Sequence, residues 1–185
     1  MNYCGLDVSS SVIGISVMDE DEKLIMSKCL IMDPKETLEQ RAAFFEQDFK
    51  TLVSKYKFDK VYIEEPAKAF GGGASTAHTI GILQRFNGMV SYVVFKHTNL
   101  MGEMINARSA RKIAGIPHVR DLKKDLLKKY LARQVQERYN EFVIGYTPKG
   151  NLKKGVGDRA DAIITCIAGI RRTKENEKES NTKTS

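Results

Sequence analysis

Apolar and polar residues alternate along the first part of the chain, which is the period of β-strands. Three segments carry the pattern, "YCGLDV", "VIGISVMD" and "KLIMSKCLIM", and the acidic stretch "DEDEK" separates the second from the third. Successive side chains of a strand point to opposite faces of a sheet, so this alternation predicts three strands in a meander, with a hairpin turn at the acidic stretch.

The apolar positions then change to helical spacing. From Lys35 to Tyr56 they recur with charged residues between them, at Leu38, Ala42, Phe45, Phe49, Leu52 and Val53. A short apolar strand, "DKVYIEEP", follows and is broken by its proline. The rest of the pattern predicts helices over 76–95, 119–139 and 157–171, and a short strand near "LMGEMI". This order of elements predicts an α/β fold with a mixed sheet.

Length and composition limit the class of protein. The 185 residues suffice for one domain with a sizeable core, which we place at 1–172. The closing stretch "TKENEKESNTKTS", residues 173–185, lacks apolar side chains, so we expect a disordered polar tail. No apolar run is long enough to span a bilayer, no export signal is visible, and the three cysteines form no CxxC pair. We therefore expect a cytoplasmic protein with buried, reduced thiols and no membrane contact.

The charge is positive and unevenly placed. The formal net charge is +7, and much of it lies in "RSARKIAG", "VRDLKKDLLKKYLAR" and "PKGNLKKGVGDR" in the second half of the chain. Basic segments of this kind are compatible with a polyanionic partner such as nucleic acid.

Acidic residues stand where the pattern otherwise has apolar ones. Asp7 lies on the first predicted strand, Glu64 ends the apolar "VYI" strand, and Asp158 and Asp161 lie one turn apart on one face of the last helix. If the first strand is central, with the fourth beside it and the helix over both, the four carboxylates meet in one pocket. Such a cluster repels itself unless it binds cations, and oxygen ligands without Cys or His favour Mg²⁺ or Mn²⁺.

Each acid also has a simpler interpretation. Asp7 could belong to a turn, Glu64 could pair with a lysine, and Asp158 could cap the last helix. Glu65 faces away from Glu64 on its strand, so we expect it to contact solvent or an arginine. The occurrence of three separate acidic sites in one small domain favours a metal site over three unrelated caps.

Three segments resemble a known family. "GLDVSSSVIGISV", "VYIEEP" and "GDRADAIITCIAG" are similar to the active-site segments of RuvC-type Holliday-junction resolvases, which are RNase H-like nucleases. Gly14 falls where the family keeps a glycine on its second strand. The family usually has Pro-Gly after the first aspartate, where this chain has Val8 and Ser9, so the resemblance is to a divergent or phage member. It implies an RNase H-like fold, a mixed five-stranded sheet with helices on both faces, in a bacterial or phage-infected cell.

The resemblance also implies roles for individual residues. Asp7, Glu64, Asp158 and Asp161 would be the four metal-binding acids, holding two Mg²⁺ ions for phosphodiester hydrolysis, with Mn²⁺ as a substitute. Lys124 best matches the active-site lysine of the resolvases, with Lys123 next. For Lys123 and Lys128, a solvated helix face is an equal alternative. We expect Arg111, Lys123 and Lys124 to contact DNA.

The loop "AKAFGGGAS" follows the strand that carries Glu64. In the resolvases an aromatic residue of this loop enters the junction, and Phe70 is the local candidate, with Lys68 as a second DNA contact. The alternative is that Phe70 packs in the core. No Gly-Lys-Ser/Thr follows the glycines, so the loop is not a nucleotide P-loop.

The helix over 76–95 bears on assembly. It carries two apolar stripes, so one could cover the sheet while the other binds a second copy, or both could be buried: Ile80, Leu83, Val90 and Val94 form one, and Ile82, Phe86, Met89 and Val93 the other. A two-fold homodimer would suit symmetric cutting of a four-way junction.

The sequence therefore predicts a magnesium-dependent endonuclease that cuts four-way DNA junctions. A nuclease of the same superfamily that acts on RNA or other branched DNA stays open, as does a non-catalytic nucleic-acid-binding module. A sugar-kinase or actin-like ATPase is a further alternative, because "GLDVSSSVIGISV" also resembles the phosphate-binding turn of those proteins. The chain is short for their second lobe.

Overall fold

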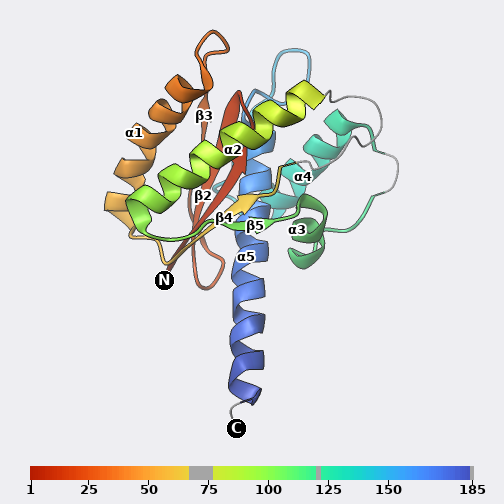
Figure 1. Ribbon diagram of the computed structural model, residues 1–185. Helices are drawn as coiled ribbons and strands as arrows, with labels where there is room; N and C mark the ends of the chain where they lie inside the picture. Colours follow the sequence, from red (N-terminus) through yellow and green to blue (C-terminus); the bar gives the residue numbers. More distant parts are fainter. Residues whose placement is uncertain (67–76, 120–121, 184–185) are drawn as a thin grey trace.

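A five-stranded mixed sheet organises the computed structural model, which describes residues 1–66, 77–119 and 122–183 (Figure 1). The strand order is β3-β2-β1-β4-β5. The strands are β1 (Asn2–Val8), β2 (Val12–Asp19), β3 (Leu24–Ile31), β4 (Lys60–Glu64) and β5 (Glu103–Ile105). The first three pair antiparallel, and β4 runs parallel to both β1 and β5. The predicted meander is confirmed, with β1 at the centre of the sheet.

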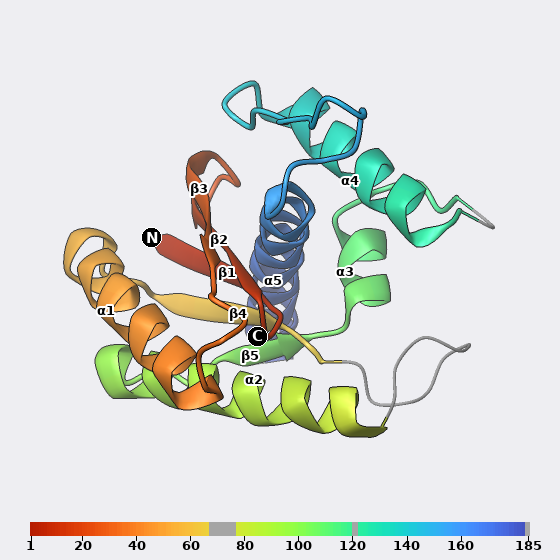
Figure 2. The same ribbon diagram turned by 90° about the horizontal axis from the view of Figure 1, so that it is seen from above.

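Helices cover both faces of the sheet. They are α1 (Leu38–Tyr56), α2 (Ala77–Thr98), α3 (Ala107–Ile113), α4 (Lys124–Arg138) and α5 (Val156–Lys183). Figure 2 shows α1 and α2 on one side of the strands and α5 on the other, with α3 and α4 beyond it. This is the predicted RNase H-like arrangement.

The alternation of the strands fills two separate cores. Leu6, Ile13 and Ile63 point toward α1 and α2, where Phe45 and Phe49 complete a fully buried cluster. The residues between them face α5, as Tyr3, Met18 and Tyr62 do. The hydroxyl of Ser16 on β2 donates to the carbonyl of Ala162 on α5 over 3.0 Å, which fastens the helix to the sheet. The face covered by α5 is therefore the one on which Asp7 and Glu64 lie.

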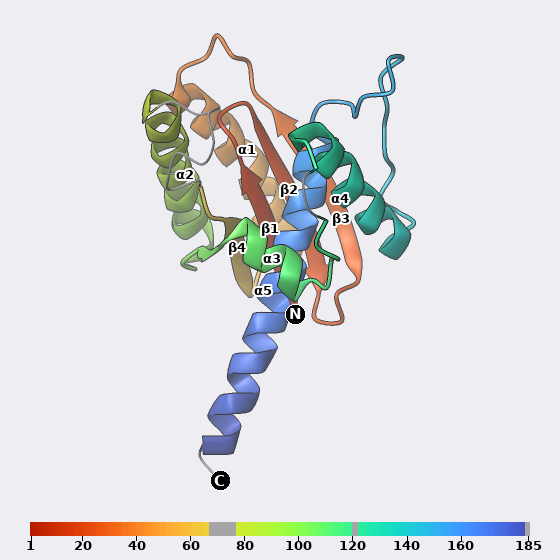
Figure 3. The same ribbon diagram turned by 90° about the vertical axis from the view of Figure 1, so that its right-hand side faces the viewer.

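The long helix α5 extends beyond the sheet (Figure 3). It continues to Lys183, through the stretch that we expected to be a disordered tail from residue 173. Thr173 is buried, and its hydroxyl lies 2.8 Å from that of Tyr62, so the packed part of the helix passes the expected boundary. Glu and Lys residues dominate the remaining turns, and both are good helix formers, so a helix already packed on the sheet propagates through them.

One helix was not predicted. The segment "ARSARKI" was interpreted only as basic, yet it forms α3. The side chain of Asn106 accepts hydrogen bonds from the backbone amides of Arg108 and Ser109, which is a helix N-cap. An Asn directly before a run of helix-forming residues was the signal that could have located it.

Both apolar stripes of α2 contribute to the core of this chain. Ile80, Val90 and Val94 from one stripe are buried, and so are Phe86 and Val93 from the other. Within this chain, the second stripe is thus mostly covered by α1 and the sheet. Among the described helices, none is long and apolar enough to cross a membrane.

Candidate active site

The parallel pairing of β1 and β4 brings two acids together. Leu6 pairs with Ile63, so Asp7 and Glu64 come next to each other at the ends of adjacent strands. Their neighbours Leu6 and Ile63 are fully buried on the opposite face. Because side chains alternate along a strand, both carboxylates point to the face that α5 covers.

A close approach between β2 and α5 adds the third acid. Gly14 pairs with Asp7 across the antiparallel strands β1 and β2. A Cβ atom at Gly14 would lie 2.0 Å from the carbonyl oxygen of Asp158, so only a glycine lets the first turn of α5 lie this near the sheet. One turn later, Asp161 is 7% exposed and directed at the same place.

Three carboxylates form the centre of the site. Ligand oxygens of Asp7, Glu64 and Asp161 all lie within 4.8 Å of one another. Asp158, the fourth predicted acid, is outside this group, and its carboxylate accepts a hydrogen bond of 3.1 Å from the ammonium of Lys128. The donor set consists of oxygens, with no sulfur or imidazole in the group, and this is the chemistry that suits Mg²⁺ or Mn²⁺.

Burial and mutual repulsion shift the titration of these acids. Burial raises the pKa of Asp7 well above its usual range, and the charges of Glu64, Asp161 and Asp158 raise it further. Burial, together with the charge of Asp161, raises the pKa of Glu64 to about 8. Burial also raises the pKa of Asp161, although Arg111 and Lys128 oppose the shift. The cationic side chains nearby therefore do not offset the burial and mutual repulsion of these acids, as expected of a site that holds a cation.

Two cationic side chains border the cluster. A guanidinium nitrogen of Arg111, on α3, lies 3.6 Å from a carboxylate oxygen of Asp161. Burial lowers the pKa of Lys128, but Asp158, Asp161 and Asp7 together outweigh burial and leave that pKa raised. Lys128 is therefore a charged partner of the acids.

The predicted basic residues are placed as follows. Lys123 and Lys124 are exposed at the start of α4, while Lys128, one turn further on, makes the contact with Asp158. The sequence interpretation preferred Lys124, and the signal for Lys128 was its i, i+4 spacing from that residue. Arg111 was expected only on DNA, and it lies beside the acids. Phe70 and Lys68 lie outside the described residues.

Ser9 closes the turn that precedes β2. Its hydroxyl donates to the carbonyl of Val12 over 2.8 Å and accepts from the amide of Val12 at 3.0 Å. These bonds hold the turn at the position where the resolvases usually have Pro-Gly. Glu65, which we expected to contact solvent or an arginine, is half-buried, and its carboxylate lies 3.5 Å from the side-chain nitrogen of Asn106.

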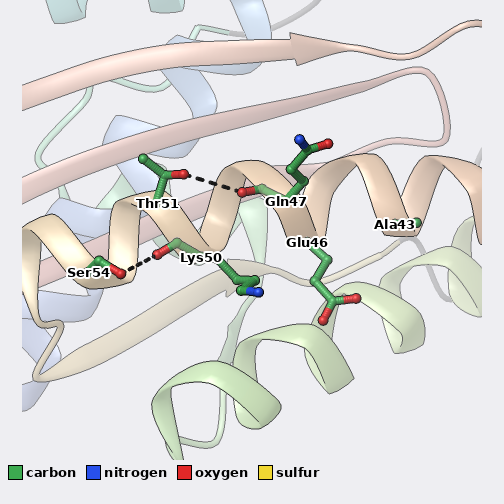
Figure 4. A pocket seen from close by; sticks show the side chains of 6 residues that line it. All are labelled: Ala43, Glu46, Gln47, Lys50, Thr51 and Ser54. Carbon is green, nitrogen blue, oxygen red and sulfur yellow. Dashed lines mark hydrogen bonds between the residues drawn. The ribbon is translucent and has the colours of Figure 1, made fainter.

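A separate hollow of about 550 Å³ lies along the outer side of α1 (Figure 4). Its single acid, Glu46, points toward α2, where Lys96 and His97 lie 2.8 Å and 2.6 Å from the carboxylate. This carboxylate is already paired, and the hollow has no cluster of acids to hold a metal.

Known proteins share this architecture. No protein-family model matches the sequence, and no curated protein matches it. RuvC of Thermus thermophilus, in complex with a Holliday junction, superposes with a TM-score of 0.65 at 13% identity, covering 95% of this chain and 96% of that one. A second structure of Thermus thermophilus RuvC gives 0.65 at 15% identity, with 95% and 97% covered. The yeast mitochondrial Holliday junction resolvase Ydc2 gives 0.60 at 13% identity, with 97% and 82% covered.

Identities of this size establish the fold alone. The chain has the α/β fold of RuvC-type Holliday-junction resolvases over nearly its whole length, as its sequence motifs predict. The chemistry of the site must be argued from its own residues.

Proposed function

We propose that this chain is a Mg²⁺-dependent endonuclease that cuts four-way DNA junctions. The observation that carries the proposal is the group of Asp7, Glu64 and Asp161, whose carboxylate oxygens lie within 4.8 Å of one another at the carboxyl ends of two parallel strands. The fold, shared with proteins named as Holliday-junction resolvases, supports the choice of substrate.

The proposed metal ligands follow from the geometry. Asp7 would hold the cations, since burial and the charges of Glu64, Asp161 and Asp158 all raise its pKa and a bound cation would offset that repulsion. Glu64 and Asp161 would complete the set, with Asp158 beside them. Bound divalent cations supply the activation of a water molecule and relieve the charge on the leaving oxygen.

The cationic side chains have a different task. Arg111 lies against Asp161 of the cluster and Lys128 against the neighbouring Asp158, so both are near enough to bind the phosphate that the acids alone would repel. Lys128 would release Asp158 and donate to a phosphate oxygen, adding a charge-assisted hydrogen bond as negative charge develops there.

A basic pocket lies beside the acids, between α4 and the loop before α5, where a bound DNA strand would continue. It has a volume of about 550 Å³ and includes Asp158 and Ser9. Five lysines line it, two of them from the loop before α5: Lys124, Lys128, Lys129, Lys153 and Lys154. This concentration of charge would hold phosphates next to the cleaved one, and it would give Lys124 a role on DNA without contact to the acids.

A homodimer is the proposed state. Tyr92 and Phe95 on α2 are 64% and 45% exposed, and an apolar hollow runs beside Tyr92 between α1 and α2. Two copies joined through this face would bring two acid clusters to one junction, which has two equivalent strands to cut.

The test is a cleavage assay with a panel of substrates. Four-way junction, duplex, flap DNA and structured RNA are offered in Mg²⁺, in Mn²⁺ and in EDTA. We expect metal-dependent cutting of the junction in preference to the others. Preferred cutting of RNA or flaps would replace the proposed substrate, and binding without any cutting would favour the non-catalytic module.

A further inference from the structure

A second pocket lies on the other side of α4, next to the acid cluster. Its volume is about 610 Å³, within the range of small-ligand sites. The base of the pocket is apolar, with Ile116 and Leu131 only 8% and 2% exposed and Leu127 half-buried beside them. Arg108 and Lys112 from α3 add positive charge at its edge.

The wall formed by the end of α3 is fixed. Gly115 has a φ of +71°, and its amide bonds to the carbonyl of Lys112, while the amide of Ile116 bonds to the carbonyl of Arg111. This is a Schellman motif, which sets Ile116 in a defined position after the helix. Arg138 reinforces the turn by donating to the carbonyls of Ala114 and Gly115.

The opposite wall is fixed as well. The hydroxyl of Tyr130, on α4, donates to the carbonyl of Pro117 over 3.1 Å, so the ring is held across the pocket from α3. The pocket therefore exists before any ligand arrives, which lowers the entropy cost of binding.

Arg111 joins this pocket to the acid cluster. Its side chain lines the pocket, and its guanidinium nitrogen lies 3.6 Å from Asp161. Its Nε atom is buried and lacks a hydrogen-bond partner in the described part of the chain. Buried donors are almost always paired, so Arg111 has hydrogen-bonding capacity that the described residues leave unused.

We propose, on the basis of the proposed nuclease function, that the pocket receives one unstacked base of the nucleotide next to the cleaved phosphate. The apolar base of the pocket and Tyr130 match the flat faces of a nucleobase, and Arg108 and Lys112 match the phosphates that flank it. Arg111 lines the pocket and also lies against Asp161. A phosphate bound at the acids and a base bound at Ile116 would therefore come from neighbouring nucleotides of one strand. Unstacking costs least where strands are already distorted, as at the centre of a junction.

The pocket would therefore select the cutting position. Its walls are fixed, so bases of different size and shape fit it differently. Junction shape would govern binding, and this pocket would govern which phosphate is cut.

The experiment combines a filled pocket with a fluorescent base. Leu127→Trp occupies the pocket, Tyr130→Ala removes one wall, and Leu126→Trp is the matched control, since Leu126 is the preceding residue, is 50% exposed and does not line the pocket. Each change is made in the parent and in Asp7→Asn. With Asp7→Asn, a junction carries 2-aminopurine next to the cut position. In the parent background, cutting is compared among junctions that differ only in that base.

In the Asp7→Asn background, we expect 2-aminopurine fluorescence to rise when the junction binds, with or without Leu126→Trp. The rise should be absent when Leu127→Trp or Tyr130→Ala is added. The base preference in cutting should be lost in both pocket variants and kept in Leu126→Trp. Thermal melting shows that each variant is folded. Equal fluorescence and equal base preference in Leu127→Trp and Leu126→Trp would overturn the proposal. A parent that cuts no junction would instead overturn the proposed function.

Discussion

Gly14 on β2 lies directly beneath the backbone of Asp158 on α5, where an added Cβ would come within 2.0 Å of the carbonyl oxygen and 2.4 Å of the carbonyl carbon. Both are backbone atoms, which cannot rotate away as a side chain would. This contact sets the depth of α5 against the sheet, and with it the position of Asp161 relative to Asp7 and Glu64.

Gly14→Ala should therefore push the first turn of α5 away from the sheet. We expect a loss of about 3 kcal/mol or more in the free energy of unfolding, at the upper end of overpacking effects, together with weaker binding of Mg²⁺. Gly81→Ala is the matched control, because a Cβ at that position of α2 meets nothing within 4 Å. It should gain about 0.5–1 kcal/mol, as Gly-to-Ala changes in exposed helices do. Urea unfolding of the two variants gives the comparison, and equal stability would contradict the close contact.

Replacing Lys128 and replacing Lys124 should affect different steps of junction cutting. Lys128 contacts Asp158, while Lys124 is exposed one turn away in the same pocket. Lys128→Ala should lower the single-turnover rate of junction cutting by about a hundredfold, as the loss of a positioned donor does. Lys124→Ala should mainly weaken binding and reduce its salt dependence. A larger loss of rate in Lys124→Ala would reverse the assignment of the two lysines.

The metal-free protein should become less stable as the pH rises. Burial and the charge of Asp161 raise the pKa of Glu64 from 4.5 to about 8, so between these values the folded chain holds a proton that the unfolded chain has released. Raising the pH then favours unfolding. In EDTA, the melting temperature should fall between roughly pH 5 and roughly pH 8. Glu64→Gln should make the melting temperature depend less on pH. A melting temperature that rises over the same range in EDTA would contradict the electrostatics of the cluster.

Phe70 can be assigned by comparing stability with activity. If it enters the junction, Phe70→Ala should reduce cutting and leave the melting temperature unchanged. If it packs in the core, the change should cost about 3–5 kcal/mol of stability. The two outcomes are exclusive, so thermal melting together with the junction assay decides between them.

Much of the fold follows from local pattern. The alternation in β1, β2 and β3 fixed their faces, and the apolar spacing of α1 fixed its buried side. Asp7 and Glu64 were expected to meet if the first strand is central with the fourth beside it, which is the observed order, and the i, i+3 spacing predicted that Asp158 and Asp161 lie on one face of the last helix. Sequence spacing says nothing of the distances between segments that are far apart in the chain. It therefore could not show that Asp158 pairs with Lys128 while Asp161 joins the other two acids.

The remaining differences have physical causes of the same kind. The basic residues of α3 and α4 look equivalent in the sequence, and only the packing of both helices against α5 singles out Arg111 and Lys128. The polar composition of residues 173–185 was taken as disorder, although Glu and Lys also favour helices when a packed segment starts them. The two stripes of α2 did not reveal that residues of both, among them Phe86 and Val93 of the second, are buried within this chain.

The central claim is that Asp7 holds the metal for cutting a four-way junction, and Asp7→Asn tests it most directly. Single-turnover cutting of a four-way junction in Mg²⁺ is measured beside junction affinity and the Mg²⁺-induced rise in melting temperature. Asp7→Asn removes a buried charge that neighbouring acids repel, so it should fold at least as well as the parent and bind the junction with similar affinity. It should lose nearly all cutting and most of the stabilisation by Mg²⁺. Cutting of the junction by Asp7→Asn at the parental rate, with parental dependence on Mg²⁺, would contradict the assignment of the site.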